Sequence, residues 1–135
     1  MSPVHVHDER TLTELDHRRI ERLIRTVAPL HPLDDMLASA RLVPSREVDR
    51  DIVTMYSQIL VTDLDGRRRR KFALCYPHDA EPAAGFISVL SPFGTSLLGL
   101  AVGAVARWDL PFGRVAAAHV TEMLFQPEAS GDYTL

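Results

Sequence analysis

Apolar and polar positions in the first third of the chain alternate with the period of a helix. Over residues 14–27, apolar side chains recur every three or four positions, at Ile20, Leu23, Ile24 and Val27. Arginine and glutamate fill most of the other positions, so the segment predicts an amphipathic helix. Thr13, three residues before Asp16, predicts an N-cap with an acidic first turn.

The helical pattern breaks at Pro29 and Pro32 and then returns. Leu33 starts a second run with the same spacing, which Pro44 ends. We therefore expect helices at 14–27 and 33–43, forming a short antiparallel helical hairpin over residues 13–47. Residues 1–12 are expected to form a flexible N-terminal tail.

From about Val48 the pattern takes the period of a strand. Residues 56–77 predict two strands joined by a tight turn at Asp65-Gly66. Further strands are expected at 85–90, 103–110 and 116–126, with a two-turn helix at 94–100. The chain is thus predicted to be an α+β protein in which a helical hairpin precedes a small antiparallel sheet, residues 48–135, wrapped on a short helix.

Composition narrows the classes of protein that remain. A chain of 135 residues with 46% hydrophobic residues can bury one core and a small appendage. The net charge of −3 argues against a non-specific nucleic-acid binder, and the single cysteine excludes an internal disulfide. Because no apolar run approaches about 20 residues and the start has no signal-peptide pattern, we expect a soluble, cytoplasmic protein with no membrane contact.

Four stretches carry a resemblance to a known family. They are DIVTMYSQ, SPFGTSLLGLAVG, LPFG and the ending FQPEASGDYTL. Together they resemble the bacterial Gre-type (GreA/GreB) transcription elongation factor superfamily, and the ending is typical of its Rnk-like branch. The resemblance covers residues 51–135 almost continuously. It implies a short N-terminal coiled-coil hairpin, an FKBP-like domain without isomerase function, and RNA polymerase as the partner, bound at the rim of its secondary channel.

The resemblance points to one loop as the polymerase-binding site. By position it assigns this contact to Ser91 and Pro92, with Phe93 beside them, although Leu90 stands where many relatives have a polar or acidic residue. Pro92 would limit the entropy lost on docking, and Phe93 would offer rigid apolar area. The alternative is that Ser91-Pro92 only caps the following helix, since proline is favoured at the first helical position.

The acidic residues at the tip of the hairpin decide whether transcript cleavage is expected. Cleavage factors of the superfamily carry acidic residues on a long coiled coil to the polymerase active centre, where carboxylates can hold a magnesium ion. Asp34 and Asp35 are of that type, but helices of about 21 Å and about 16 Å, at 1.5 Å per residue, are too short to reach it. The alternative role of these carboxylates is to stabilise a helix N-terminus. We therefore expect a monomeric regulator without cofactor, metal or enzymatic activity, which binds polymerase without stimulating cleavage.

Two other clusters leave alternatives open. His5 and His7, with the tip aspartates, are ligand types of a metal-dependent or enzymatic module, the alternative function for this chain. The basic run Arg67–Lys71 is either a solvated, charged strand edge or a weak contact to nucleic-acid phosphates.

Single residues complete the sequence-based picture. Cys75 is expected to be buried and inert, because its nearest candidate base, His78, has no evident orienting partner. We expect His17 and His31 to face solvent and Trp108 to be at least half-buried in the sheet.

Overall fold

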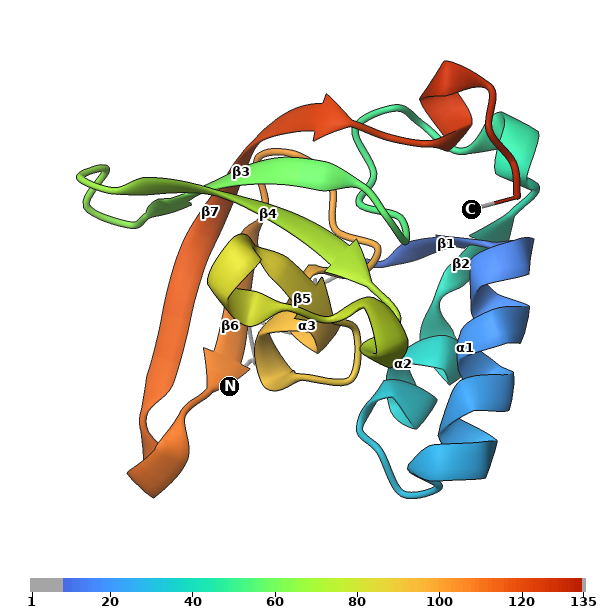
Figure 1. Cartoon of the computed structure of the whole chain (residues 1–135), viewed down its shortest axis with the longest axis horizontal. Helices are drawn as coiled ribbons and strands as arrows, with labels where there is room; N and C mark the ends of the chain where they lie inside the picture. Colours follow the sequence, from blue (N-terminus) through green and yellow to red (C-terminus); the bar gives the residue numbers. More distant parts are fainter. Residues whose placement is uncertain (1–8, 135) are drawn as a thin grey trace.

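The computed structural model describes residues 9–134, in which a pair of helices packs beside a curled five-stranded sheet (Figure 1). Helix α1 spans Glu14–Val27, as predicted. Its cap also forms as predicted, with the Thr13 hydroxyl oxygen accepting the Asp16 backbone N–H at 3.0 Å. Ile20 and Ile24 are buried, whereas Val27, at the end of the stripe, is 58% exposed.

The second helix is shorter than the sequence pattern predicted. Helix α2 spans Leu33–Ser39, and the chain turns extended at Ala40. The next three residues form strand β2, Arg41–Val43, which pairs in parallel with strand β1, Thr11–Thr13. The expectation of a helix to residue 43 is therefore wrong, because pairing with β1 buries Val43 and brings Leu12 to 1% exposure.

Pairing of β1 also corrects the N-terminal boundary. Residues 11 and 12 were expected to belong to a flexible tail, but they form β1 with Thr13. The Thr11 N–H donates to the Gly99 carbonyl at 3.1 Å, and the Arg10 guanidinium donates to the Thr95 and Leu98 carbonyls. The base of the hairpin is therefore tied to the sheet domain.

The large sheet has the strand order β5-β4-β3-β7-β6. Its strands span Gln58–Asp63 (β3), Arg69–Cys75 (β4), Phe86–Ser88 (β5), Val105–Asp109 (β6) and Val115–Phe125 (β7). All five lie at predicted positions, and β3 and β4 form the predicted hairpin. Two register shifts between β3 and β7 accompany the long sweep of β7 across the sheet (Figure 1).

One pairing in this sheet differs from the all-antiparallel expectation. Strand β5 runs parallel to β4, with Leu74 opposite Ile87. The connection between them passes through two short 3₁₀ turns, Pro77–Asp79 and Pro82–Ala84, which carry the chain back before β5 begins. A crossover of this kind gives a parallel pair, whereas a tight turn would give an antiparallel one. The sheet is therefore mixed.

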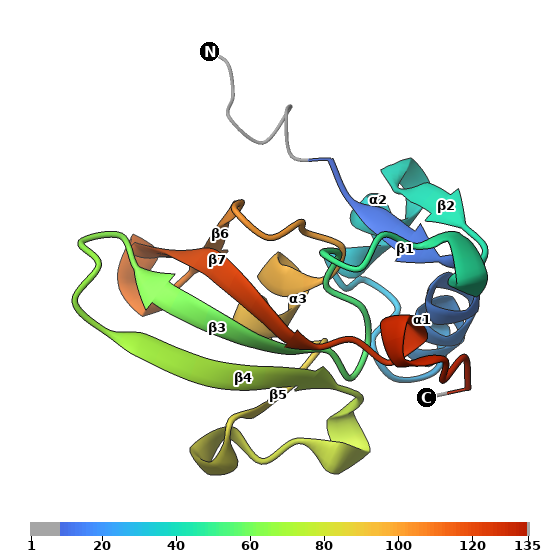
Figure 2. The same ribbon diagram turned by 90° about the horizontal axis from the view of Figure 1, so that it is seen from above.

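Helix α3, Pro92–Leu97, lies between the sheet and the helical pair (Figure 2). It approaches the backbone at the end of β5 so closely that a Cβ on Gly94 would lie 1.9 Å from the Ser88 carbonyl oxygen. A single buried cluster joins the two parts of the chain. It includes Leu12, Ile20 and Leu33 from the hairpin, and Met55, Ile59, Leu97 and Leu98 from the sheet domain.

Within residues 9–134 the longest helix is α1, and none of the helices combines the length and apolar character that crossing a bilayer requires.

Candidate functional site

Ser91 and Pro92 open helix α3, and the serine hydroxyl both donates and accepts a hydrogen bond inside the loop. Ser91 Oγ donates to the Ser88 carbonyl at 2.7 Å and accepts the Gly94 N–H at 3.0 Å. Pro92 occupies the first helical turn, where its missing N–H costs nothing, and its side chain is exposed. Ser91 therefore caps α3, the docking role of the pair stays a prediction, and Pro92 is the member that faces outward.

Phe93 points into the fold. Its ring lies edge-on to Phe72, with centroids 4.9 Å apart, and packs at 4.5 Å on Trp108, which is half-buried as predicted. A cavity of about 350 Å³ lies against these three rings. Phe93 therefore anchors the loop to the sheet, and Pro92 supplies the outer surface.

Asp34 and Asp35 lie in the first turn of α2, and both are exposed. Their position fits the stabilisation of a helix N-terminus, where backbone N–H groups and the helix dipole favour negative charge. In the part of the chain that the structure describes, no three histidine, cysteine or acidic side chains gather as a metal site would require. His5 and His7, the other proposed ligands, lie outside the described residues.

The hairpin tip contacts the Ser91-Pro92 loop through His31. Its Nδ1 accepts the Leu33 N–H at 3.0 Å, so the ring proton resides on Nε2, which donates to the Leu90 carbonyl at 2.7 Å. A cleft of about 340 Å³ between tip and loop is lined by Pro32, Pro92 and Trp108 among others. The tip therefore lies beside the candidate docking loop.

The expectation that His17 and His31 face solvent is wrong. Both rings are half-buried, because each is held at a backbone carbonyl: His31 at Leu90, and His17 at Leu37, 3.1 Å from its Nε2. His17 links α1 to α2, whereas His31 links the hairpin to the sheet domain.

Sequence reasoning missed a buried carboxyl group on α1. Asp16 is 1% exposed and accepts the Met55 N–H at 3.1 Å, across the boundary between hairpin and sheet domain. Burial raises its pKa from 3.8 to about 7, and the charge of Glu128 adds to the shift. Glu128 accepts the Thr54 hydroxyl proton at 2.7 Å, and partial burial raises its pKa as well. The available signal was that residues 16, 20 and 24 lie on one helix face.

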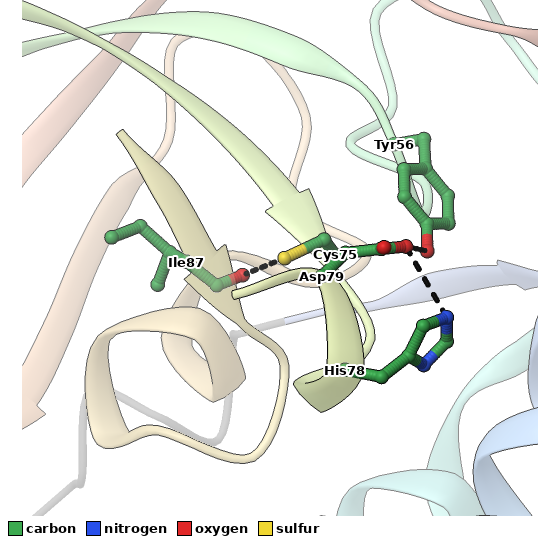
Figure 3. Close-up of polar contacts among 5 residues, drawn as sticks. All are labelled: Tyr56, Cys75, His78, Asp79 and Ile87. Carbon is green, nitrogen blue, oxygen red and sulfur yellow. Dashed lines mark hydrogen bonds and ion pairs between the residues drawn. The ribbon is translucent and has the colours of Figure 1, made fainter. Parts of the chain in front are cut away.

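Cys75 and His78 do not form a catalytic pair (Figure 3). Cys75 is fully buried and its Sγ faces the Ile87 carbonyl oxygen at 3.5 Å, as expected for an inert core thiol. Burial raises the pKa of this thiol, which disfavours the nucleophilic thiolate. His78 instead contacts Asp79 at 3.3 Å, and the Tyr56 hydroxyl donates to the same carboxylate oxygen.

The basic run is exposed along its whole length. Arg67 contacts Asp65 at 3.7 Å, and the Arg70 guanidinium lies 5.1 Å from the centre of the Phe72 ring. Strand β5 pairs with β4 only from Ala73 onward, so Arg69–Lys71 form an open edge. Charge at this edge discourages pairing with another chain.

Comparison with known proteins identifies the family. The family model described as "Transcription elongation factor, GreA/GreB, C-term" matches residues 46–123, more than half of the chain. This chain belongs to the GreA/GreB family. The match begins just after β2 and takes in the whole of β3, β4, β5, β6 and α3.

Individual GreA/GreB-family relatives agree with this assignment. The chain is 35% identical over 129 residues to the regulator of nucleoside diphosphate kinase of Escherichia coli (strain K12), covering 92% of this chain and 95% of the relative. Over 81 residues it is 32% identical to transcription elongation factor GreA of Flavobacterium johnsoniae, of which it covers 51%. The predicted resemblance to the Rnk-like branch is confirmed.

A solved GreA/GreB-family structure has the same fold. The prokaryotic transcription elongation factor GreA/GreB from Nitrosomonas europaea superposes with a TM-score of 0.72 at 30% identity. The superposition covers 87% of this chain and 98% of the other. The mixed helix and sheet architecture is therefore that of a bacterial GreA/GreB-like protein.

Proposed function

We propose that this chain is a non-catalytic transcription regulator that binds RNA polymerase at the rim of its secondary channel without stimulating transcript cleavage. Membership of the GreA/GreB family supports a role in transcription, and similarity to a protein named as a regulator supports a role other than catalysis. The polymerase contact is assigned to the loop of Ser91, Pro92 and Phe93.

The observation that carries the proposal is the short reach of the hairpin. Helix α2 has 7 residues, so at 1.5 Å per residue it extends about 11 Å. The hydrogen bond from His31 to the Leu90 carbonyl holds the tip against the sheet domain. Asp34 and Asp35 therefore stay close to the docking loop and would remain near the rim after binding.

The three loop residues have different proposed roles. Ser91 fixes the start of α3, Phe93 anchors the loop on Phe72 and Trp108, and Pro92 touches the partner. Pro32 lines the same cleft as Pro92, which extends the contact surface toward the hairpin tip. A rigid, preorganised loop loses little entropy on binding.

We also propose that the family's domain division applies here. Residues 13–47 would be the coiled-coil-type hairpin and 48–135 the FKBP-like domain, consistent with a family match that begins at residue 46. The open edge at Arg67–Lys71 would add at most a weak contact to nucleic-acid phosphates. The unit is proposed to act as a monomer without cofactor.

A matched pair of proline variants tests the docking surface. We expect Pro92→Asp to reduce retention of the protein by immobilised core RNA polymerase about tenfold or more, because it places charge on the apolar contact. Aspartate suits a helix N-terminus, so α3 should persist. Pro82→Asp changes an exposed proline that also opens a short helix, and should bind as the unchanged protein does.

A cleavage assay tests the second half of the proposal. Stalled elongation complexes should show no faster transcript shortening when the protein is added with magnesium. An excess of the protein should slow shortening driven by a cleavage factor, because both would occupy the same rim. Rapid shortening by the protein alone, or equal retention of the Pro92→Asp and Pro82→Asp variants, would contradict the proposal.

A further inference from the structure

An open cavity lies away from the proposed docking loop. It has a volume of about 720 Å³ and is bounded by α1 on one side and residues 76–79 on the other. This size is within the range of small-molecule sites. Neither the Ser91-Pro92 loop nor the hairpin tip lines it, so the proposed polymerase contact leaves it unexplained.

One wall of the cavity is aromatic and held in place. Tyr76 and His78 have nearly parallel rings, 2° apart in angle with centroids at 6.5 Å, and Tyr56 packs on Tyr76 at 5.8 Å. Asp79 contacts both the Tyr56 hydroxyl and the His78 ring, which orients these two rings, and its carboxylate lies on the same side of the cavity, opposite α1 (Figure 3). Such a wall suits a planar aromatic ligand.

The opposite wall supplies two guanidinium groups. Arg19 and Arg22 are three residues apart on α1 and therefore lie on one face of the helix. Arg19 already donates to an oxygen at the cavity, the Thr134 carbonyl, at 3.1 Å. The side chain of Arg22 is exposed and makes no ion pair within residues 9–134. Guanidinium groups in this arrangement favour a phosphate.

Tyr76 lines the cavity, but its hydroxyl oxygen is closed off from solvent. The Tyr76 hydroxyl is buried and lacks a well-formed hydrogen bond among the described residues, although Arg19 lies beside it. Burial raises the pKa of this hydroxyl further above neutral, so it carries no negative charge that would repel a phosphate. Leu23, Val27 and Pro77 complete an otherwise apolar lining.

We propose that this cavity binds a small aromatic phosphate monoester of the nucleoside monophosphate type. The ring packs against Tyr56, Tyr76 and His78, and the phosphate binds Arg19 and Arg22. The aromatic rings and the guanidinium groups line opposite sides of one cavity. A ligand with both an aromatic ring and a phosphate should therefore bind more tightly than a ligand with only one of them. This inference is independent of polymerase binding.

Calorimetric titration of the whole chain with adenosine 5′-monophosphate tests the proposed site. We expect saturable binding to one site, with adenosine and inorganic phosphate each at least about tenfold weaker, since each lacks one half of the contacts. Chemical shifts of Tyr56 and Tyr76 should move on titration. Equal affinity for inorganic phosphate, or no saturable binding up to millimolar nucleotide, would overturn the proposal.

Matched variants on α1 locate the binding. Arg22→Gln should weaken nucleotide binding about fivefold or more and leave adenosine binding unchanged, because it removes a contact to phosphate only. Arg25→Gln, on the same helix but paired with Glu21 outside the cavity, should bind as the unchanged protein. His78→Ala should weaken both nucleotide and adenosine. Identical affinities for Arg22→Gln and Arg25→Gln would refute the assignment.

Discussion

Asp16 is an acidic residue in a buried, largely apolar environment. Its carboxyl group lies on the apolar stripe of α1, where a leucine would pack, and receives the Met55 N–H. The sequence pattern showed an acidic first turn but not which side of the helix the carboxyl would face. That depends on the position of Met55, 39 residues away, which local periodicity does not encode.

The raised pKa of Asp16 makes stability depend on pH. The folded protein keeps a proton on this group up to about pH 7, whereas the unfolded chain releases it near its ordinary pKa of 3.8. The stabilisation is therefore complete below about pH 4 and is lost as the pH rises through 7. We expect Asp16→Asn to remove most of this decline, which is on the order of a few kcal/mol at one pKa unit per 1.4 kcal/mol. The free energy of unfolding, measured by urea titration at pH 4.5, 6 and 8 for both proteins, tests this expectation.

An exposed aspartate provides the control for the pH series. Asp34→Asn removes the same charge from a solvated position, so its pH dependence should follow that of the unchanged protein. Glu128, whose pKa burial also raises, is expected to contribute to the slope that Asp16→Asn leaves. If Asp16→Asn and Asp34→Asn show the same slope, the carboxyl of Asp16 is not the source.

At the scale of elements, the length of the apolar pattern decided most of what the sequence could predict, and the three-residue β5 was found because it lies inside the longer apolar run 85–90. Helix α1 and the strands β3, β4, β6 and β7 have at least five residues each, enough for a period of 3.6 or 2 to be recognised. Strands β1 and β2 have three residues each and no recognisable period. Their parallel pairing, and the early end of α2 that follows from it, arise from contacts between distant segments.

The direction of β5 and the position of the hairpin tip were missed for related reasons. Periodicity gives the existence of a strand but not its neighbour, so β5 was expected in an antiparallel sheet. The contact between His31 and Leu90 joins two loops whose polar residues look solvated in sequence. The candidate docking loop was chosen by resemblance, and the aromatic packing of Phe93 became visible only in the fold.

The His31 contact can be separated into its two hydrogen bonds. An asparagine side chain at position 31 can still accept the Leu33 N–H, as His31 Nδ1 does. It is too short to reach the Leu90 carbonyl, which His31 Nε2 contacts. His31→Asn should therefore keep the turn and lose the link to Leu90. We expect His31→Asn to cost about 1 kcal/mol of unfolding free energy, and His31→Ala about 1 kcal/mol more.

Amide hydrogen exchange gives a local readout of this link. Loss of the contact should speed exchange in the turn around Leu90 and Ser91, while the amides of β3 and β7 keep their protection. Unchanged exchange near Leu90 in His31→Asn would mean that the tip is not held to the loop in solution.

At the scale of the whole molecule, hairpin and sheet share one core. Leu12, Ile20 and Leu33 belong to the same buried cluster as Met55 and Leu97. The proposed division at residue 48 therefore separates two parts by ancestry and topology. It does not separate two parts that would each be stable alone. Removing the hairpin would expose apolar surface and leave the Met55 N–H without its Asp16 acceptor.

A truncated chain tests this dependence. We expect a fragment of residues 48–135 to lack a cooperative thermal transition and to be cleaved rapidly by protease, because its share of the core is uncovered. A chain of residues 9–135, which retains the hairpin, should unfold cooperatively. A stable, protease-resistant 48–135 fragment would show that the sheet domain folds without the hairpin.

The central position of β3 constrains how the protein is made. Its neighbour β4 begins at Arg69, soon after β3 ends, but its other neighbour β7 begins only at Val115. On the ribosome, the β3–β4 hairpin therefore emerges with one edge uncovered until residues 115–125 have left the exit tunnel. During that interval the nascent chain offers a strand edge of unpaired backbone N–H and C=O groups, together with the apolar side chains of β3, and segments of this kind are held by chaperones and are prone to aggregate.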